Sequence, residues 1–143
     1  MNKIAIVYWS GTGNTEIMAN CIAAGAKDAG AAVDLLSPGQ FSAADVDNYQ
    51  AIAFGCPAMR AEQLDEDEFE PMFSAVEGSL SGKKVALFGS YGWGDGQWMR
   101  DWCERTGGDG ANLYDEEGLT VNGTPDDEGE AACQALGQAL AEW

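Results

Sequence analysis

A segment near the start of the chain has the residue types of a phosphate-binding loop: Ser10, Gly11, Thr12, Gly13, Asn14 and Thr15. The loop follows an apolar run over 4–9 and precedes a helical pattern, so it would lie at a helix N-terminus. Backbone N–H groups and the helix dipole favour an anion there. The two glycines let the backbone turn sharply, and the hydroxyl and amide side chains add donors. An ordinary strand-to-helix turn is the alternative interpretation.

The residues that this loop lacks exclude two classes of phosphate ligand. A nucleoside triphosphate loop ends in Gly-Lys-Ser/Thr, whereas Gly13 is followed by Asn14. A dinucleotide fingerprint needs a third glycine at the position that Glu16 occupies. The loop is therefore predicted to bind one terminal phosphate through neutral donors and a helix dipole.

Two later segments also follow apolar runs and carry residues suited to a flat ring. At 90–96, Trp93 stands between glycines at a strand end, where backbone N–H groups and an aromatic face could meet a planar ligand. At 56–62, Met59 supplies a thioether and Glu62 a carboxylate acceptor. A flat heterocycle between Met59 and Trp93, with its phosphate in the first loop, describes a flavin mononucleotide (FMN) site. The alternatives are Trp93 as a rigid turn filler and Met59 as a core residue.

The His and Cys content argues against other chemistries. The chain has no His, which removes the usual general base and the commonest metal ligand, so hydrolysis is not indicated. The four cysteines contain no C-x-x-C pair and suggest neither a disulfide framework nor a zinc site. We expect no metal, no catalytic residue and no covalent attachment of a flavin.

The hydrophobic pattern predicts a three-layer α/β fold in one domain, residues 1–143. Continuous apolar runs at 4–9, 51–56 and 84–89 are typical of strands buried on both faces of a parallel sheet. A weaker run at 32–36 predicts an edge strand, and the last strand is expected to be split by an acidic loop at 115–118. Helices are expected after the phosphate loop, over 66–77, around 98–103, and from Thr124, interpreted as a helix cap, to the end of the chain.

Strands that alternate with helices in this way predict a doubly wound sheet of five parallel strands, in the order 2-1-3-4-5. Ligands of such sheets bind outside the carboxyl ends of the strands, where the strand order reverses. This point would bring the loops at 9–15 and 56–62 together, with the loop at 90–97 beside them. The Met and aromatic residues at helical spacing are instead expected in the core: Phe69, Phe73, Trp98 and Trp102.

The net charge of −17 at pH 7 bears on the partners of the protein. Nucleic acid and anionic membranes are themselves polyanions, so neither is expected as a partner. A basic protein surface is a better candidate, although acidity that only keeps the protein soluble is equally compatible with the sequence. No apolar run has the length of a membrane span or a signal-peptide core, and we expect a cytoplasmic protein.

The chain resembles the short-chain flavodoxins from residue 3 to the final helix. The specific matches are VYWSGTGNTE at 7–16, GCPAM at 55–59, EFEP at 68–71 and GKKVALFGSYGWGDG at 82–96. The short connection at 114–118 leaves no room for the insertion of long-chain members. The resemblance implies a flavodoxin-like fold and a monomeric carrier. Such a carrier would take single electrons at low potential between redox proteins, on non-covalent FMN, without a substrate of its own.

The resemblance also implies roles for individual residues. Residues 10–15 would hold the FMN phosphate, Met59 and Trp93 would flank the isoalloxazine ring, and Glu62 would accept a hydrogen bond from the flavin N3–H. Ring-edge and ribityl contacts would come from two backbone stretches: Cys56, Pro57 and Ala58, and Ser90, Tyr91, Gly92, Trp93 and Gly94.

One position departs from the family pattern. Short-chain flavodoxins usually have Gly after the Met that corresponds to Met59, and a peptide carbonyl there turns towards the flavin N5–H after the first electron is added. This chain has Arg60 and Ala61. A turn with positive φ favours Gly, and a Cβ there costs on the order of 1 kcal/mol. We therefore expect the neutral semiquinone to be stabilised less than in Gly-bearing relatives. The gap between the two one-electron potentials would then be narrower.

Three alternatives have to be distinguished from a carrier. A response-regulator receiver shares the strand order but needs paired acids after its first strand, where this chain has Tyr8, Trp9 and Ser10. An NAD(P)H- or quinone-linked flavin reductase on the same fold needs space over the ring, which Met59 and Trp93 would occupy. A flavin-free interaction module would be colourless when purified.

Overall fold

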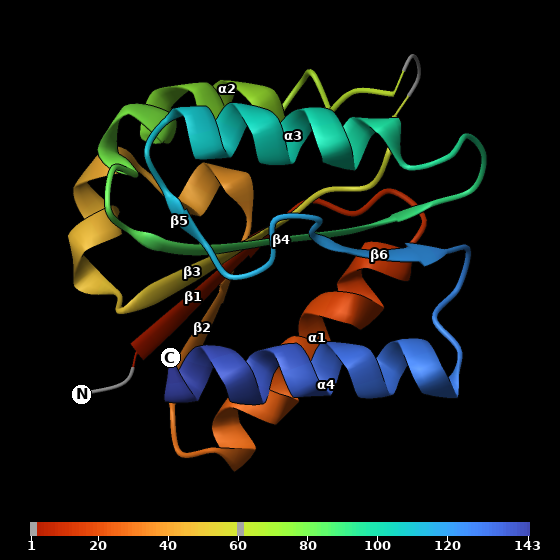
Figure 1. Cartoon of the computed structure of the whole chain (residues 1–143), viewed down its shortest axis with the longest axis horizontal. Helices are drawn as coiled ribbons and strands as arrows, with labels where there is room; N and C mark the ends of the chain where they lie inside the picture. Colours follow the sequence, from red (N-terminus) through yellow and green to blue (C-terminus); the bar gives the residue numbers. More distant parts are fainter. Residues whose placement is uncertain (1–2, 60–61) are drawn as a thin grey trace.

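The computed structural model describes residues 3–59 and 62–143. Three layers are formed, with α2 (Phe69–Val76) and α3 (Gln97–Gly108) on one face of the sheet and α1 (Asn14–Asp28) and α4 (Asp127–Glu142) on the other (Figure 1). Short 3-10 turns span Pro38–Gln40, Ala43–Asn48 and Glu77–Ser79. The predicted α/β class and its three layers are confirmed.

The parallel sheet has the predicted strand order. Its strands are β1 (Lys3–Tyr8), β2 (Ala32–Leu36), β3 (Ala51–Gly55), β4 (Lys84–Tyr91) and β5 (Asn112–Leu113), in the order β2-β1-β3-β4-β5. The last strand is split as expected, because β6 (Leu119–Asn122) also pairs with β4, beyond the loop at 114–118. The strands β3 and β4 are buried along nearly their whole length, whereas β2 at the edge is half exposed.

The two helical layers are packed by different kinds of residue. Between the sheet and the α2–α3 layer lie the predicted core aromatics, of which Phe69, Phe73 and Trp102 contact one another edge-on or stacked. On the other face, α1 and α4 meet through glycines. A Cβ on Gly137 would lie 1.9 Å from the carbonyl oxygen of Ile22, and one on Gly25 would lie 2.0 Å from that of Gln134. The backbones of these helices are therefore in direct contact.

The start of α4 differs from the prediction. The helix is capped by Asp126, whose carboxylate accepts a hydrogen bond from the N–H of Gly129 at 2.8 Å. Thr124 is not the cap, because Pro125 and Asp126 both follow it before the helix begins. An Asp carboxylate is at least as good an N-cap as a Thr hydroxyl, and here the helix begins directly after Asp126, two residues later than expected. The hydroxyl of Thr124 instead donates to Asn14 Oδ1 at 3.1 Å.

Candidate functional site

Three loops meet at the carboxyl ends of the central strands, as the strand order requires. Backbone hydrogen bonds join them: the N–H of Trp9 donates to Gly55 O at 3.0 Å, and that of Ala58 to Ser90 O at 3.0 Å. The loops after β1, β3 and β4 therefore form one surface at the switch point between β1 and β3.

The loop at 10–15 lies at the N-terminus of α1 and is held in shape by hydrogen bonds to one of its own side chains. Gly13, at φ +97°, is the residue before the helix. The hydroxyl oxygen of Ser10 accepts the N–H groups of Gly13 at 3.1 Å and Glu16 at 3.3 Å, so it shapes the loop from inside. The N–H groups of Thr12, Asn14 and Thr15 have no partner among residues 3–59 and 62–143. These N–H groups, with the exposed Thr12 hydroxyl, are free to bind an anion.

Thr15 and Ser90, which the sequence assigns to different parts of the site, contact each other. Their hydroxyl oxygens are 3.0 Å apart, and the Ser90 N–H donates to the Thr15 hydroxyl at 3.3 Å. Both side chains are buried. This contact ties the first turn of α1 to the end of β4, and so fixes the loop at 10–15 relative to the loop at 90–97.

Glu62 is bound to the start of α3 in this structure. Its carboxylate accepts the N–H of Trp98 at 2.9 Å, as a cap for that helix from outside its own segment. The second oxygen, Oε1, lies over Gly94, where a Cβ would come within 1.8 Å of it. Gly94 also has φ +81°, so a glycine is required there twice over. Because a carboxylate can accept several hydrogen bonds, Glu62 retains acceptor capacity for a ligand.

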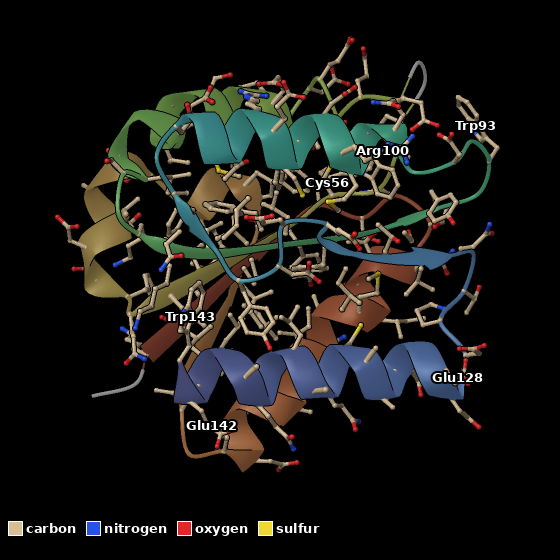
Figure 2. All side chains as sticks on the ribbon, in the orientation of Figure 1. Cys56, Trp93, Arg100, Glu128, Glu142 and Trp143 are labelled. Carbon is tan, nitrogen blue, oxygen red and sulfur yellow. The ribbon has the colours of Figure 1, made fainter. Side chains whose placement is uncertain are left out.

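Trp93 differs from the other tryptophans in the site region. It is 58% exposed at the tip of the β4–α3 loop, whereas Trp98 is 2% exposed and donates its indole N–H to Cys56 O at 3.1 Å. Figure 2 shows Trp93 at the outer edge of the molecule, with Cys56 inside beneath α3. A residue that only filled a turn would be covered, so the exposed ring is better suited to stacking on a ligand.

The loop after β3 has an ordered base. The Met59 N–H donates to Gln63 O at 2.8 Å, and the Glu62 N–H to Met59 O at 3.1 Å. Met59 is half-buried, as are Pro57 and Ala58. Arg60 and Ala61 lie outside the described residues, so the expectation about their turn stays a prediction.

Cys56 is a structural residue of this loop. Its sulfur accepts the N–H of Asp65 at 3.4 Å, and burial raises the pKa of the thiol to about 12. A thiol that stays protonated at neutral pH is a poor nucleophile, which agrees with a non-covalent ligand.

The acidic stretch at 62–70 is less of a charged surface than its sequence indicates. Asp65 is buried and caps α2 through the N–H groups of Glu68 and Phe69, at 2.8 and 3.0 Å. Glu70 forms a two-point ion pair with Arg105, at 2.8 Å for both contacts, and this guanidinium lowers the pKa of the Glu70 carboxyl. The exposed acids that remain here are Glu66, Asp67 and Glu68.

The structure brings together the three segments that carry the predicted site residues, with Arg60 outside the described residues, and it adds one bordering segment that the sequence analysis did not include. The segment after β6 reaches the loop at 10–15, where the Thr124 hydroxyl donates to Asn14 Oδ1 at 3.1 Å. The only residue of this segment that the sequence analysis singled out was Thr124, and it was interpreted as the cap of the last helix.

Within residues 3–59 and 62–143, no cluster of acids, Cys or His is arranged to hold a metal, and no helix is long and apolar enough to cross a membrane.

Comparisons with known proteins agree on one family. A family model described as flavodoxin matches residues 6–136. Flavodoxin from Megasphaera elsdenii is 47% identical over 139 residues, covering 97% of this chain and 98% of its own, and flavodoxin from Clostridium beijerinckii is 47% identical over 136 residues, covering 95% and 97%.

Solved structures extend this agreement to the fold. The solution structure of two-electron reduced Megasphaera elsdenii flavodoxin has a TM-score of 0.87 at 45% identity, covering 98% of this chain and 99% of that one. Oxidised flavodoxin 1 from Bacillus cereus has a TM-score of 0.85 at 28% identity, covering 99% and 98%. The chain therefore belongs to the flavodoxin family, whose members are electron-transfer proteins with a flavin cofactor rather than enzymes.

Proposed function

We propose that the flavin is FMN, bound non-covalently across the three loops. The observation that carries this proposal is the loop at 10–15, where free N–H groups and neutral side chains gather at the N-terminus of α1 without a Lys or Arg. Such a site suits a single terminal phosphate, which FMN has and riboflavin lacks. The exposed face of Trp93 at the same end of the sheet suits the flavin ring.

Each loop has a separate task in this proposal. Residues 10–15 bind the phosphate, and Met59 and Trp93 cover the two faces of the ring. Glu62 accepts the flavin N3–H while it keeps its bond to Trp98. The contacts at the ring edge and the ribityl chain come from backbone groups at 56–58 and 90–94. When bound, FMN supplies the one-electron chemistry of the protein.

The protein's own contribution is to orient the ring and to limit its contact with water. The buried Thr15–Ser90 contact and the Glu62–Trp98 contact tie the three loops to one another. Trp93 stands at the molecular surface (Figure 2), so a ring beneath it would be within a short distance of a docked protein.

A carrier and a flavin reductase predict different responses to a nicotinamide reductant. We expect FMN-loaded protein to be bleached stepwise by dithionite and to keep its yellow absorbance for at least an hour, as a rough time limit, with excess NADPH alone. The readout is the visible spectrum under anaerobic conditions. Rapid bleaching by NADPH without a second protein would favour the reductase, and a protein that takes up no flavin would favour an interaction module.

We propose further that the partners are redox proteins with basic docking surfaces, and that the carrier is a cytoplasmic monomer. The net charge of −17 and the exposed acids at 66–68 beside the site support the proposal of basic docking surfaces on the partners. Raising the salt concentration from about 20 to 500 mM is expected to slow reduction by a basic partner enzyme roughly tenfold, because screening removes electrostatic steering. Stopped-flow absorbance measures this rate, and a rate independent of salt would contradict the docking proposal.

A further inference from the structure

The connection between β6 and α4 contacts the phosphate loop through one side chain. Thr124 Oγ1 donates to Asn14 Oδ1 at 3.1 Å, across 110 positions in the sequence. Asn14 is the first residue of α1, directly after Gly13 of the loop. The contact therefore lies at the helix N-terminus to which the phosphate is assigned.

The connection that carries Thr124 is itself anchored at both ends. The N–H of Gly123 donates to Tyr91 O at 2.8 Å, at the end of β4, and Gly123 has φ +74°. On the other side, Asp126 caps α4 through Gly129. Since α4 already has this cap, the hydroxyl of Thr124 is not needed by the helix. Anchored backbone on both sides presents it to Asn14.

This contact decides which end of the Asn14 amide is available to a ligand. An Asn side chain has an acceptor oxygen and a two-donor nitrogen. Near a phosphate dianion the nitrogen is favourable and the oxygen is repelled. With Oδ1 occupied by the Thr124 hydroxyl, the remaining free end of the amide is Nδ2. We propose that Thr124 is a positioning residue of the phosphate site, which holds the Asn14 amide with its N–H groups towards the phosphate.

This inference rests on the proposed FMN function, and its test compares two ligands that differ only in the phosphate. Apoprotein is titrated with FMN and with riboflavin, and the dissociation constants are read from quenching of flavin fluorescence. Thr124→Val keeps the shape of the side chain but removes the donor. It is expected to weaken FMN about three- to tenfold, the effect of one lost hydrogen bond, and to leave riboflavin within about twofold.

Two further variants make the result specific. Thr124→Ser restores the hydroxyl and is expected to return FMN binding to within about twofold of the unchanged protein. Thr120→Val is the matched control, because Thr120 is exposed on β6 and its hydroxyl has no partner within residues 3–59 and 62–143. This control is expected to change neither ligand. Thr124 is also exposed, so its substitution should leave the thermal unfolding of the apoprotein unaltered.

The possible outcomes separate this inference from the function on which it rests. An unchanged FMN constant in Thr124→Val, an equal loss for FMN and riboflavin, or an equal loss in Val and Ser variants would each overturn the positioning role. If one of these outcomes is found while the unchanged protein strongly prefers FMN to riboflavin, the positioning role of Thr124 fails and the proposed phosphate site stands. If the unchanged protein does not distinguish FMN from riboflavin, the phosphate site fails and this inference fails with it.

Discussion

Replacing Gly137 by alanine is expected to lower the free energy of unfolding by about 2–4 kcal/mol. The added Cβ would lie 1.9 Å from the carbonyl oxygen of Ile22 and 2.8 Å from the backbone nitrogen of Ala26. Backbone atoms of a helix cannot rotate aside as a side chain can, so α1 and α4 must separate along their contact. The gain of up to about 1 kcal/mol in helix propensity does not offset this loss.

Gly129 in the same helix provides the matched control. A Cβ there would be 3.4 Å from the Asp126 carboxylate and 3.5 Å from Pro125 and Val121, which is ordinary contact or close to it. Gly129→Ala is expected to be neutral or to stabilise by up to about 1 kcal/mol. Urea unfolding of both apoproteins, followed by circular dichroism, measures the difference. Equal stabilities for the two variants would show that the α1–α4 contact is looser than described.

The fold could be predicted because the buried strands have a simple pattern. The runs at 4–9, 51–56 and 84–89 are apolar without alternation, and both faces of β3 and β4 are covered by helices. The weaker run at 32–36 lies at the edge of the sheet, where half exposure tolerates Asp34. The three site loops could be predicted for the same reason, since strand order alone determines which strand ends are neighbours.

Contacts between distant segments could not be predicted. Gly25 and Gly137 have no pattern that distinguishes them from other small helical residues, yet they bring two backbones together. The sequence shows that Thr15, Glu62 and Thr124 are polar, but not which distant donor or acceptor each one meets. In the acidic stretch, burial of Asp65 depends on the N–H groups that α2 presents, and these exist only after the helix has formed.

The loss of the Thr12 hydroxyl is expected to have the largest effect on the cofactor. Thr12 is exposed in the phosphate loop, and its hydroxyl has no partner among residues 3–59 and 62–143. A hydrogen bond to a charged group is worth about 1.5–3 kcal/mol, so Thr12→Val is expected to weaken FMN about 10- to 100-fold. Thr15 is less suitable for this test, because its hydroxyl also binds Ser90. Thr12→Ser keeps the donor and should remain within about threefold of the unchanged protein.

Riboflavin separates this effect from general damage to the site. It presents the same ring and ribityl chain without the phosphate, so Thr12→Val should leave its dissociation constant within about twofold. If both flavins weakened equally in Thr12→Val, the hydroxyl would act on the ring or on the fold instead of on the phosphate.

The central claim is that three loops at the switch point hold FMN, with its phosphate at the N-terminus of α1. The most direct test is the ratio of the riboflavin and FMN dissociation constants for the unchanged apoprotein, both measured by fluorescence quenching in phosphate-free buffer. Several donors directed at one phosphate should together make FMN bind at least about 100-fold more tightly than riboflavin. A ratio near one would contradict the account, because it would leave the loop at 10–15 without a ligand.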